Sequence, residues 1–118
     1  DRKKFKQPVK AISIVDEYLE HSRVIIFHNK GKEKIFISSA DWMVRNLDHR
    51  IEASLPLTRE ANKKELKDVL SIQLSDNVKA RILDNTLSNH YVPSKERKRV
   101  RSQLAIYNYL LQKNNSAD

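Results

Sequence analysis

The sequence predicts an α/β fold in which a small mixed β-sheet is flanked by helices. Two observations carry this prediction: short apolar runs rich in β-branched residues alternate with longer amphipathic stretches, and 39% of the 118 residues are apolar. A chain of this length forms one domain by default, and folding buries about two-thirds of the unfolded surface, which is enough for one core. Interleaved strands and helices favour helices packed against a sheet.

Local patterns place the elements of the first half. Ser13 and Asp16 resemble a capping box, so a helix is expected to begin there. Residues 24–27 form a wholly apolar run that suits a strand buried on both faces, and Gly31, the only glycine, marks the turn that follows. The expected elements are a helix over 14–20, a strand over 24–27, a turn over 29–32, a strand over 34–38, a short helix or irregular loop over 41–48, and a strand over 50–55 ended by Pro56.

The second half predicts two longer helices. Thr58 can cap the first of them and Ser94 the second. Residues 77–83 are expected to form a short edge strand, and the polar stretch 84–95 a loop. The helices are expected over 59–74, with a buried stripe of Leu66, Val69, Leu70 and Leu74, and from 94 to about 112, with a buried stripe of Val100, Leu104, Tyr107 and Leu111.

The composition excludes several classes of function. No apolar run approaches the ~18 residues of a membrane span, and no apolar stretch follows the basic N-terminus as in a signal peptide. The absence of cysteine excludes disulfides and thiolate metal sites, and a single glycine excludes a glycine-rich phosphate loop. We therefore expect a cytoplasmic protein, with membrane association left open.

The net charge of +8 is concentrated in two segments. Residues 1–10 carry five basic groups against one acidic group and are interpreted as a basic arm or severed linker. Residues 95–101 have the same balance, and at the start of a helix they oppose its macrodipole. An acidic neighbour, a partner domain or a bound polyanion must compensate these positive charges, and we favour a partner domain or a polyanion. The alternative interpretation of both basic segments is a solvated surface without a partner. The predicted polyanion track is Arg97, Lys98, Arg99 and Arg101.

His21 and Arg23 are the first candidate site residues. In an extended segment, alternate side chains point to one face, so the imidazole and the guanidinium would lie together. Arginine binds phosphate oxygens through its fork, and histidine can move a proton near neutral pH. The helix predicted before His21 would favour its protonated form. The alternative is an ordinary pair of surface side chains.

A second candidate group follows the strand over 34–38. The hydroxyl of Ser39, like that of its neighbour Ser38, can donate to a phosphoryl oxygen. Asp41 either supports this site or caps the turn that follows. Arg45 either reaches the anion or pairs with Glu52, and on its own the ion pair is favoured. Trp42, the only tryptophan, is expected to pack in the core.

The remaining candidates give no further site. His28, His49 and His90 are scattered without metal-ligand spacing, so no metal site is predicted. Aromatic residues make up 7% of the chain, which is low for a protein that stacks single-stranded bases, and no specific nucleic-acid partner is expected.

These motifs resemble those of the phospholipase D superfamily, which carries His-x-Lys, then Gly-Ser-x-Asn, then Arg, Leu and Glu at fixed offsets. Arg23 replaces the Lys, Asp41 replaces the Asn, and His28 stands where a later Asp falls. The matching positions are His21-x-Arg23, Ser38-Ser39-x-Asp41, Arg45, Leu47 and Glu52.

A closer resemblance covers nearly the whole chain. Residues 11–118 resemble the C-terminal, phospholipase D-like catalytic domain of bacterial polyphosphate kinase. The stretches that carry the resemblance are 11–16 (AISIVD), 18–24 (YLEHSRV), 37–43 (ISSADWM), 45–48 (RNLD) and 100–107 (VRSQLAIY).

The resemblance implies a half-site for phosphoryl transfer. The family moves the γ-phosphate of ATP reversibly onto polyphosphate, with Mg²⁺, through a phosphohistidine. His21 matches the family's second active-site histidine, whereas the phosphorylated histidine belongs to the preceding catalytic domain. The implied catalytic residue is His21, and the implied phosphate-binding residues are His21, Arg23, Ser39, Asp41 and Arg45.

Three consequences and two alternatives complete the prediction. The isolated chain is expected to be inactive, the full-length enzyme to be a homo-oligomer, and the partners to be ATP, ADP, polyphosphate and the preceding domain. The alternatives are half of a phospholipase D-like phosphodiesterase, or a non-enzymatic module that binds polyanions through its basic clusters.

Overall fold

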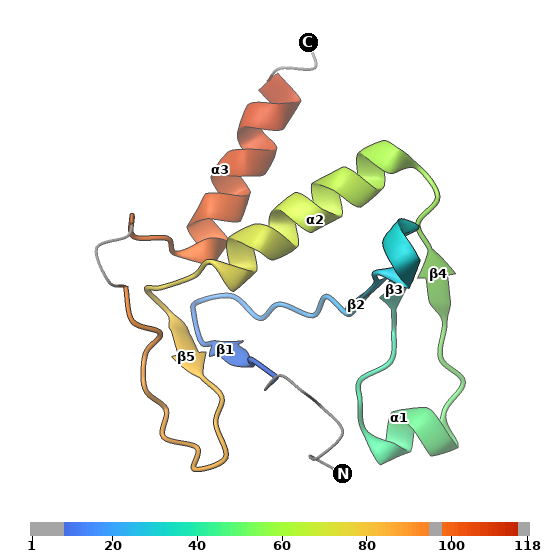
Figure 1. Ribbon diagram of the computed structural model, residues 1–118, viewed down its shortest axis with the longest axis horizontal. Coiled ribbons are helices and arrows are strands. Elements are labelled where there is room, and N and C mark those ends of the chain that lie inside the picture. The colour runs from blue at the N-terminus through green and yellow to red at the C-terminus, as the bar shows by residue number, and fades with distance from the viewer. Residues whose placement is uncertain (1–8, 95–97, 116–118) are drawn as a thin grey trace. The chain divides into compact units, whose positions relative to one another are not determined.

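The computed structural model describes residues 9–94 and 98–115 (Figure 1). The chain divides into two compact units, one formed by residues 19–68 and the other by the described parts of 1–18 and 69–118. Strands and helices alternate, so the predicted α/β class is confirmed, with the strands divided between two sheets. Among the described residues, no helix combines the length and apolar character that crossing a membrane requires.

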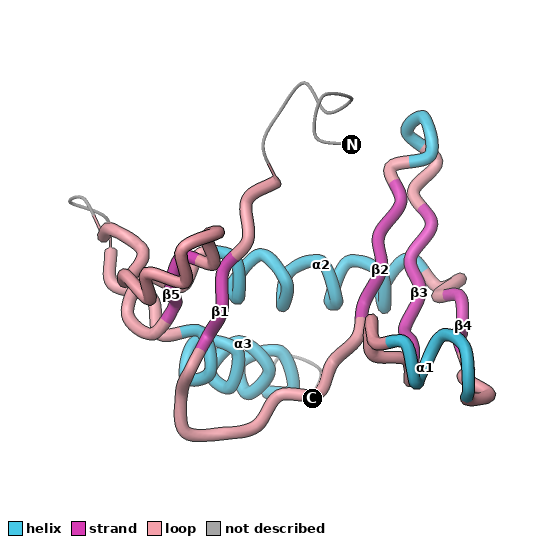
Figure 2. The backbone as a smooth tube through the Cα atoms, turned by 90° about the horizontal axis from the view of Figure 1, so that it is seen from below, coloured by secondary structure: helices cyan, strands magenta, loops and turns pink. Residues whose placement is uncertain are grey.

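The unit of residues 19–68 is built on a three-stranded antiparallel sheet. Its strands are β2 (Val24–Phe27), β3 (Lys34–Ser38) and β4 (Ser54–Pro56), in the order β2-β3-β4. The predicted hairpin is thus confirmed. Its turn and helix α1 (Val44–His49) lie at opposite ends of the β2–β3 pair (Figure 2).

The turn between β2 and β3 explains the position of the only glycine. Asn29, Lys30 and Gly31 all have positive φ, at 44°, 53° and 87°. Glycine adopts such angles without steric cost, and asparagine tolerates them better than most residues. Hydrogen bonds from the Gly31 N–H to the His28 carbonyl (3.0 Å) and from the Lys32 N–H to the Asn29 carbonyl (3.1 Å) close the turn.

The other unit contains a two-stranded antiparallel sheet. Strand β1 (Ile12–Ile14) pairs with β5 (Ala80–Ile82), and Ser13 lies opposite Arg81. Helix α3 (Ser102–Asn115) belongs to this unit, whereas α2 (Glu60–Leu74) begins in the first unit and ends in this one.

Asp76 is the polar centre of this second unit. Its side chain is buried, and its carboxylate accepts hydrogen bonds from the backbone N–H groups of Val78, Lys79 and Ala80, at 2.7–2.9 Å, and from Ser102, at 2.7 Å. Burial alone would raise the pKa of Asp76, but the bonds from Ser102, Lys79 and Ala80 outweigh it and lower the pKa to about 2. One carboxylate therefore joins the loop before β5 to the first residue of α3.

The helix predicted over 14–20 is wrong. Residues 12–14 form β1 instead, and no helix lies between β1 and β2. Asp16, expected in a capping box, accepts hydrogen bonds from the Arg101 guanidinium at 2.8 and 2.6 Å. A contact between residues far apart in sequence has overridden the local capping pattern.

Other boundaries shift for similar reasons. The last helix begins at Ser102 rather than near Ser94, because the Asp76 carboxylate accepts from the Ser102 N–H. The strand expected over 50–55 is confined to β4 and includes Pro56, which an edge strand tolerates. The helix expected over 59–74 and the strand expected within 77–83 are confirmed as α2 and β5.

Of the eight residues in the two predicted helix stripes, four are half-buried and four are exposed. Among the described residues, the only buried hydrophobic side chains are Ile35 and Ala80. Several members of the predicted helix stripes face solvent, namely Leu74, Leu104, Tyr107 and Leu111. Helix periodicity identifies an apolar face, but it does not show whether this chain alone covers that face.

We predict that Asp76→Asn destabilises the protein by about 2 kcal/mol at neutral pH, because an amide cannot accept from all of these N–H groups. The folded-state pKa of Asp76 lies below its ordinary value of 3.8. Its stabilising effect is therefore complete above pH ~4 and is lost as the pH falls towards ~2. Urea unfolding across this range measures the difference. The exposed Asp48→Asn is the control, and equal stability of both variants would contradict the prediction.

Candidate functional site

Arg23, the residue before β2, is the centre of the candidate site. Its Nε donates a hydrogen bond to Asp41 Oδ1 at 2.7 Å. Its two terminal nitrogens donate to His21, one to the backbone carbonyl at 3.3 Å and one to Nε2 of the ring at 2.6 Å. The Arg23 carbonyl accepts from the Ser38 N–H at 2.9 Å, which fixes this segment beside the end of β3.

The ion pair between Arg23 and Asp41 keeps both groups charged. The hydrogen bond from Arg23 lowers the pKa of Asp41 despite the opposing effect of desolvation, and the bond to Asp41 raises the pKa of Arg23. Both side chains are partly exposed, so solvent screens the attraction. Its contribution is positional: Asp41 orients the planar guanidinium towards His21.

The contact with Arg23 determines the tautomer of His21. A guanidinium has only donors, so Nε2 of His21 must accept the hydrogen bond and cannot carry a proton. The imidazole in this arrangement is neutral and protonated on Nδ1. The reason given for a protonated His21, a helix ending just before it, is wrong because no helix is present there.

Arg23 retains capacity for an anion. Of its five N–H groups, the three bonds above use one on each nitrogen, so among the described residues one N–H on each terminal nitrogen has no acceptor. Arg23 and Asp41 line a cleft of about 450 Å³ together with Ser38 and Trp42. The spare donors suit two oxygens of one phosphoryl group.

Ser39 belongs to a second, neighbouring network. Its hydroxyl donates a short hydrogen bond to one Glu52 carboxylate oxygen and accepts from the Ala53 N–H at 3.1 Å. The buried Asn46 donates through Nδ2 to the other Glu52 oxygen at 2.7 Å. The bond from Ser39, followed by that from Asn46, lowers the pKa of Glu52. Glu52 thus joins the end of β3 to α1.

The structure brings some predicted site residues together and separates others. His21, Arg23 and Asp41 are in direct contact, whereas the Ser39 hydroxyl is bound to Glu52. Arg45 is exposed on α1 and lowers the pKa of Asp41 electrostatically, after the larger effect of Arg23.

One prediction about a single residue is wrong, and one of the two alternatives for another residue is excluded. The ion pair between Arg45 and Glu52 does not occur in the described part of the chain, because Ser39 and Asn46 bind Glu52. Asp41 does not cap α1, whose N-cap position is Met43, without a side-chain hydrogen bond.

Trp42 does not pack in the core. It is 86% exposed, at the rim of the cleft that Arg23 lines. The apolar side chains that follow it are exposed as well, and Ile35 is the only buried hydrophobic residue in the described part of this unit. The exposed apolar segment comprises Trp42, Met43, Val44, Leu47 and Ile51.

The basic cluster over 95–101 has divided surroundings. Residues 95–97, which include Arg97 of the predicted track, lie outside the described residues. Lys98 and Arg99 are exposed. Arg101 instead pairs with Asp16 and Glu17, at 2.6 and 2.7 Å, and its pKa is raised, first by Asp16. Acidic neighbours within the chain therefore compensate the charge of Arg101, so the prediction that a partner domain or a polyanion compensates it is wrong for this residue.

Sequence reasoning missed the part played by Glu52 and Asn46. Glu52 occupies the glutamate position of the phospholipase D pattern, and that pattern was the available signal. Asn46 gave no signal, because a polar residue on a short helix is expected to face solvent. Its Oδ1 is buried and accepts no hydrogen bond from the described residues.

Comparisons with known proteins converge on one family. The sequence model described as polyphosphate kinase C-terminal domain 2 matches residues 1–103. The polyphosphate kinase of Escherichia coli (strain K12) is 55% identical over 102 residues, and that of Vibrio cholerae is 53% identical over the same length. These matches cover 86% of this chain but only 15% of each relative.

A solved structure agrees with these relatives. The crystal structure of the polyphosphate kinase from Porphyromonas gingivalis matches with a TM-score of 0.87 and 50% identity. The match covers 91% of this chain and 16% of the Porphyromonas gingivalis chain. The chain therefore spans about one-sixth of the length of the relatives it matches.

We predict that Glu52→Ala lowers the urea midpoint of unfolding, because it leaves the donors of Ser39 and the buried Asn46 without an acceptor. Glu52→Gln, which keeps one acceptor oxygen, should fall between the wild type and Glu52→Ala. Asp48→Ala on α1 is the control and should leave the midpoint unchanged. If Glu52→Ala matched this control, the network would contribute nothing to holding α1.

Proposed function

The chain belongs to the polyphosphate kinase family, and from that premise we propose that it supplies part of a site that moves the γ-phosphate of ATP reversibly onto polyphosphate. The observation that carries the proposal is the Arg23 fork. It contacts His21 and Asp41, has two N–H donors without an acceptor among the described residues, and belongs to a residue that lines an open cleft. Phosphoryl transfer depends mainly on positioning and on neutralising charge over the phosphoryl oxygens. A guanidinium held by a carboxylate supplies both.

His21 is proposed as the residue that supports the moving phosphoryl group. Its Nε2 accepts from one terminal nitrogen of Arg23 in the described structure, and a phosphoryl group that binds the spare N–H of that nitrogen can displace His21 from the other N–H. Release of Nε2 lets the ring take up a proton and donate to the phosphoryl group. Binding of the anion would thereby convert His21 from an acceptor into an acid or electrostatic stabiliser.

The roles of the other predicted residues follow from their contacts. Asp41 orients Arg23, and Arg45 adds positive charge near the cleft. Ser39 supports the site through Glu52 and reaches a phosphoryl oxygen only if its hydroxyl leaves that carboxylate. Lys98 and Arg99 are kept as candidates for the polyanion track because both are exposed.

Mg²⁺ is proposed to arrive with the nucleotide. The described residues contain no group of three or more His, Asp or Glu side chains that could hold a metal ion. Mg²⁺ usually keeps several waters and binds substrate phosphates with one or two carboxylates, so a pre-formed protein cage is not required. Asp41 and Glu52 are the nearby carboxylates, and each is already hydrogen-bonded.

A preceding catalytic domain is proposed to complete the site. The family resemblance places the phosphorylated histidine in that domain, and the matched relatives are about six times longer than their match to this chain. The exposed apolar segment that begins at Trp42 offers it a surface beside the cleft. A homo-oligomeric, cytoplasmic enzyme remains part of this proposal.

We predict that His21→Ala, made in the longer enzyme, lowers turnover by at least ~10²-fold, the usual scale for a positioned acid–base group. His28→Ala, which changes an exposed histidine at the other end of β2, is the matched control. ATP-dependent polyphosphate synthesis measures the effect. Near-normal turnover of His21→Ala would refute this role. If neither the wild type nor the variants made polyphosphate, and His21→Ala bound polyanions as the wild type does, the result would favour the non-enzymatic module.

We further predict that ADP changes the fluorescence of Trp42, because the only tryptophan lines the cleft. Arg23→Gln should lower the ADP affinity obtained from this fluorescence change at least about tenfold, as expected for loss of a charged phosphate contact. Arg59→Gln removes an exposed arginine that does not line the cleft and should behave as the wild type. Equal ADP affinity of both variants would show that Arg23 does not bind the phosphates.

A further inference from the structure

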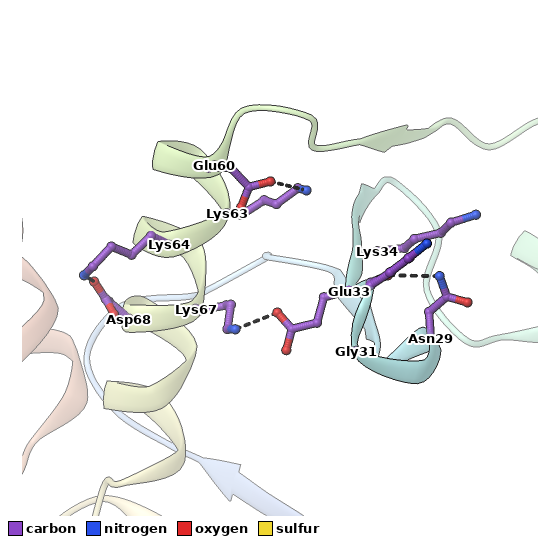
Figure 3. A pocket seen from close by; sticks show the side chains of 10 residues that line it. Asn29, Gly31, Glu33, Lys34, Glu60, Lys63, Lys64, Lys67 and Asp68 are labelled. Carbon is purple, nitrogen blue, oxygen red and sulfur yellow. Dashed lines mark hydrogen bonds and ion pairs between the residues drawn. The ribbon is translucent and has the colours of Figure 1, made fainter.

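A second hollow lies at the turn end of the β2–β3 hairpin. It has a volume of about 770 Å³, and its walls are the turn with the start of β3 on one side and the first turns of α2 on the other (Figure 3). The hollow, called the lysine pocket below, is lined by Asn29, Gly31, Lys32, Glu33, Lys34, Glu60, Lys63, Lys64, Lys67 and Asp68.

The charge of the lysine pocket is positive and unevenly compensated. Five lysines line it against three carboxylates. The three carboxylates pair with lysines of α2, each at 2.6–2.8 Å: Glu60 with Lys63, Asp68 with Lys64, and Glu33 with Lys67. Within the described part of the chain, the two lysines of the hairpin, Lys32 and Lys34, have no ion-pair partner.

The walls of the lysine pocket are held in place by specific contacts. The Asn29 amide donates to the Lys32 carbonyl at 2.9 Å and fixes the turn that carries Lys32 (Figure 3). Lys67 donates to Glu33 across the hollow and connects α2 to the hairpin. The ammonium groups therefore extend from two ordered elements, which lowers the entropic cost of binding a ligand between them.

The lining shows which anion fits. No aromatic or aliphatic side chain lines the lysine pocket, so a nucleobase would find nothing to stack on. Ammonium groups act as point charges for phosphate, and several of them along two walls suit a ligand with several phosphoryl groups. We propose that the lysine pocket binds inorganic polyphosphate through Lys32, Lys34 and the lysines of α2, as a site separate from that of Arg23.

This inference rests on the proposed function, because it assigns the lysine pocket to a later portion of the same polyphosphate acceptor. The two sites lie at opposite ends of the β2–β3 pair (Figure 2). A strand of four or five residues is roughly 13–17 Å long, a span that an extended polyanion can cover but a single phosphate cannot. A polyphosphate chain should therefore bind more tightly than pyrophosphate.

Two unique reporters allow both sites to be observed in one experiment. Gly31 is the only glycine and lines the lysine pocket, while Trp42 is the only tryptophan and lines the Arg23 cleft. In a ¹H–¹⁵N correlation spectrum of the 118-residue protein, their amide and indole signals are followed during titration with linear polyphosphate, pyrophosphate, ADP and single-stranded DNA. We expect polyphosphate to shift the Gly31 signal, and ADP to shift the Trp42 signal alone.

Variants that remove positive charge and a variant that removes negative charge should change polyphosphate affinity in opposite directions. Lys32→Gln with Lys34→Gln should weaken polyphosphate binding at Gly31 by about fivefold per ammonium removed at low salt. Glu33→Gln removes one negative charge from the lysine pocket, while its amide oxygen can still accept from Lys67, and it should tighten binding. Lys10→Gln with Lys113→Gln removes the same charge outside both sites and should match the wild type. ADP titrations followed at Trp42 should be the same in all four proteins.

The possible outcomes separate the two proposals. An unmoved Gly31 signal, equal weakening by the control pair, or DNA or pyrophosphate binding as tightly as polyphosphate would overturn the lysine-pocket proposal. An unmoved Trp42 signal with ADP, together with a polyphosphate-dependent shift of Gly31, would count against the nucleotide site and leave the lysine pocket supported.

Discussion

The three-way contact of Arg23 with His21 and Asp41 is the constraint on which the candidate site depends. It orders a segment that has no helix or strand of its own and fixes it beside the end of β3. A flexible histidine on such a segment would sample many orientations, whereas a guanidinium bound on one edge by Asp41 presents a defined edge to the ring. The lone pair on Nε2 of His21 is thereby bound in the described structure. In the proposed function it becomes available when a phosphoryl group displaces it from Arg23.

Carboxylates organise the rest of the chain in the same way. Asp76 joins the loop before β5 to α3, and Glu52 joins the end of β3 to α1. Asp16 binds Arg101 in the same unit as Asp76. With Ile35 and Ala80 as the only buried hydrophobic side chains among the described residues, these polar contacts fix positions that a larger apolar core would otherwise fix. Charge-assisted hydrogen bonds suit this purpose because they are stronger and more directional than neutral ones.

Sequence patterns correctly predicted the elements that depend on residues close together in the sequence. The hairpin, its glycine turn and α2 follow from β-branched runs, the positive φ at Gly31 and helix periodicity. The helix expected after Ser13 failed because pairing of β1 with β5 and the bond between Asp16 and Arg101 join residues far apart in sequence. The motif spacing singled out His21, Arg23 and Asp41, which are in contact in the structure, but it could not show that Ser39 binds Glu52. The prediction that Trp42 packs in the core failed because the described residues of its unit leave its side chain exposed.

The most direct test of this account is the protonation of His21 in the unliganded protein, read from its imidazole ¹⁵N chemical shifts at about pH 8. The His21 signals are assigned by comparison with a His21→Gln variant. The account predicts a neutral ring protonated on Nδ1, with Nε2 as the acceptor, and loss of that preference in Arg23→Gln. A ring protonated on Nε2, or shifts that do not respond to Arg23→Gln, would contradict it.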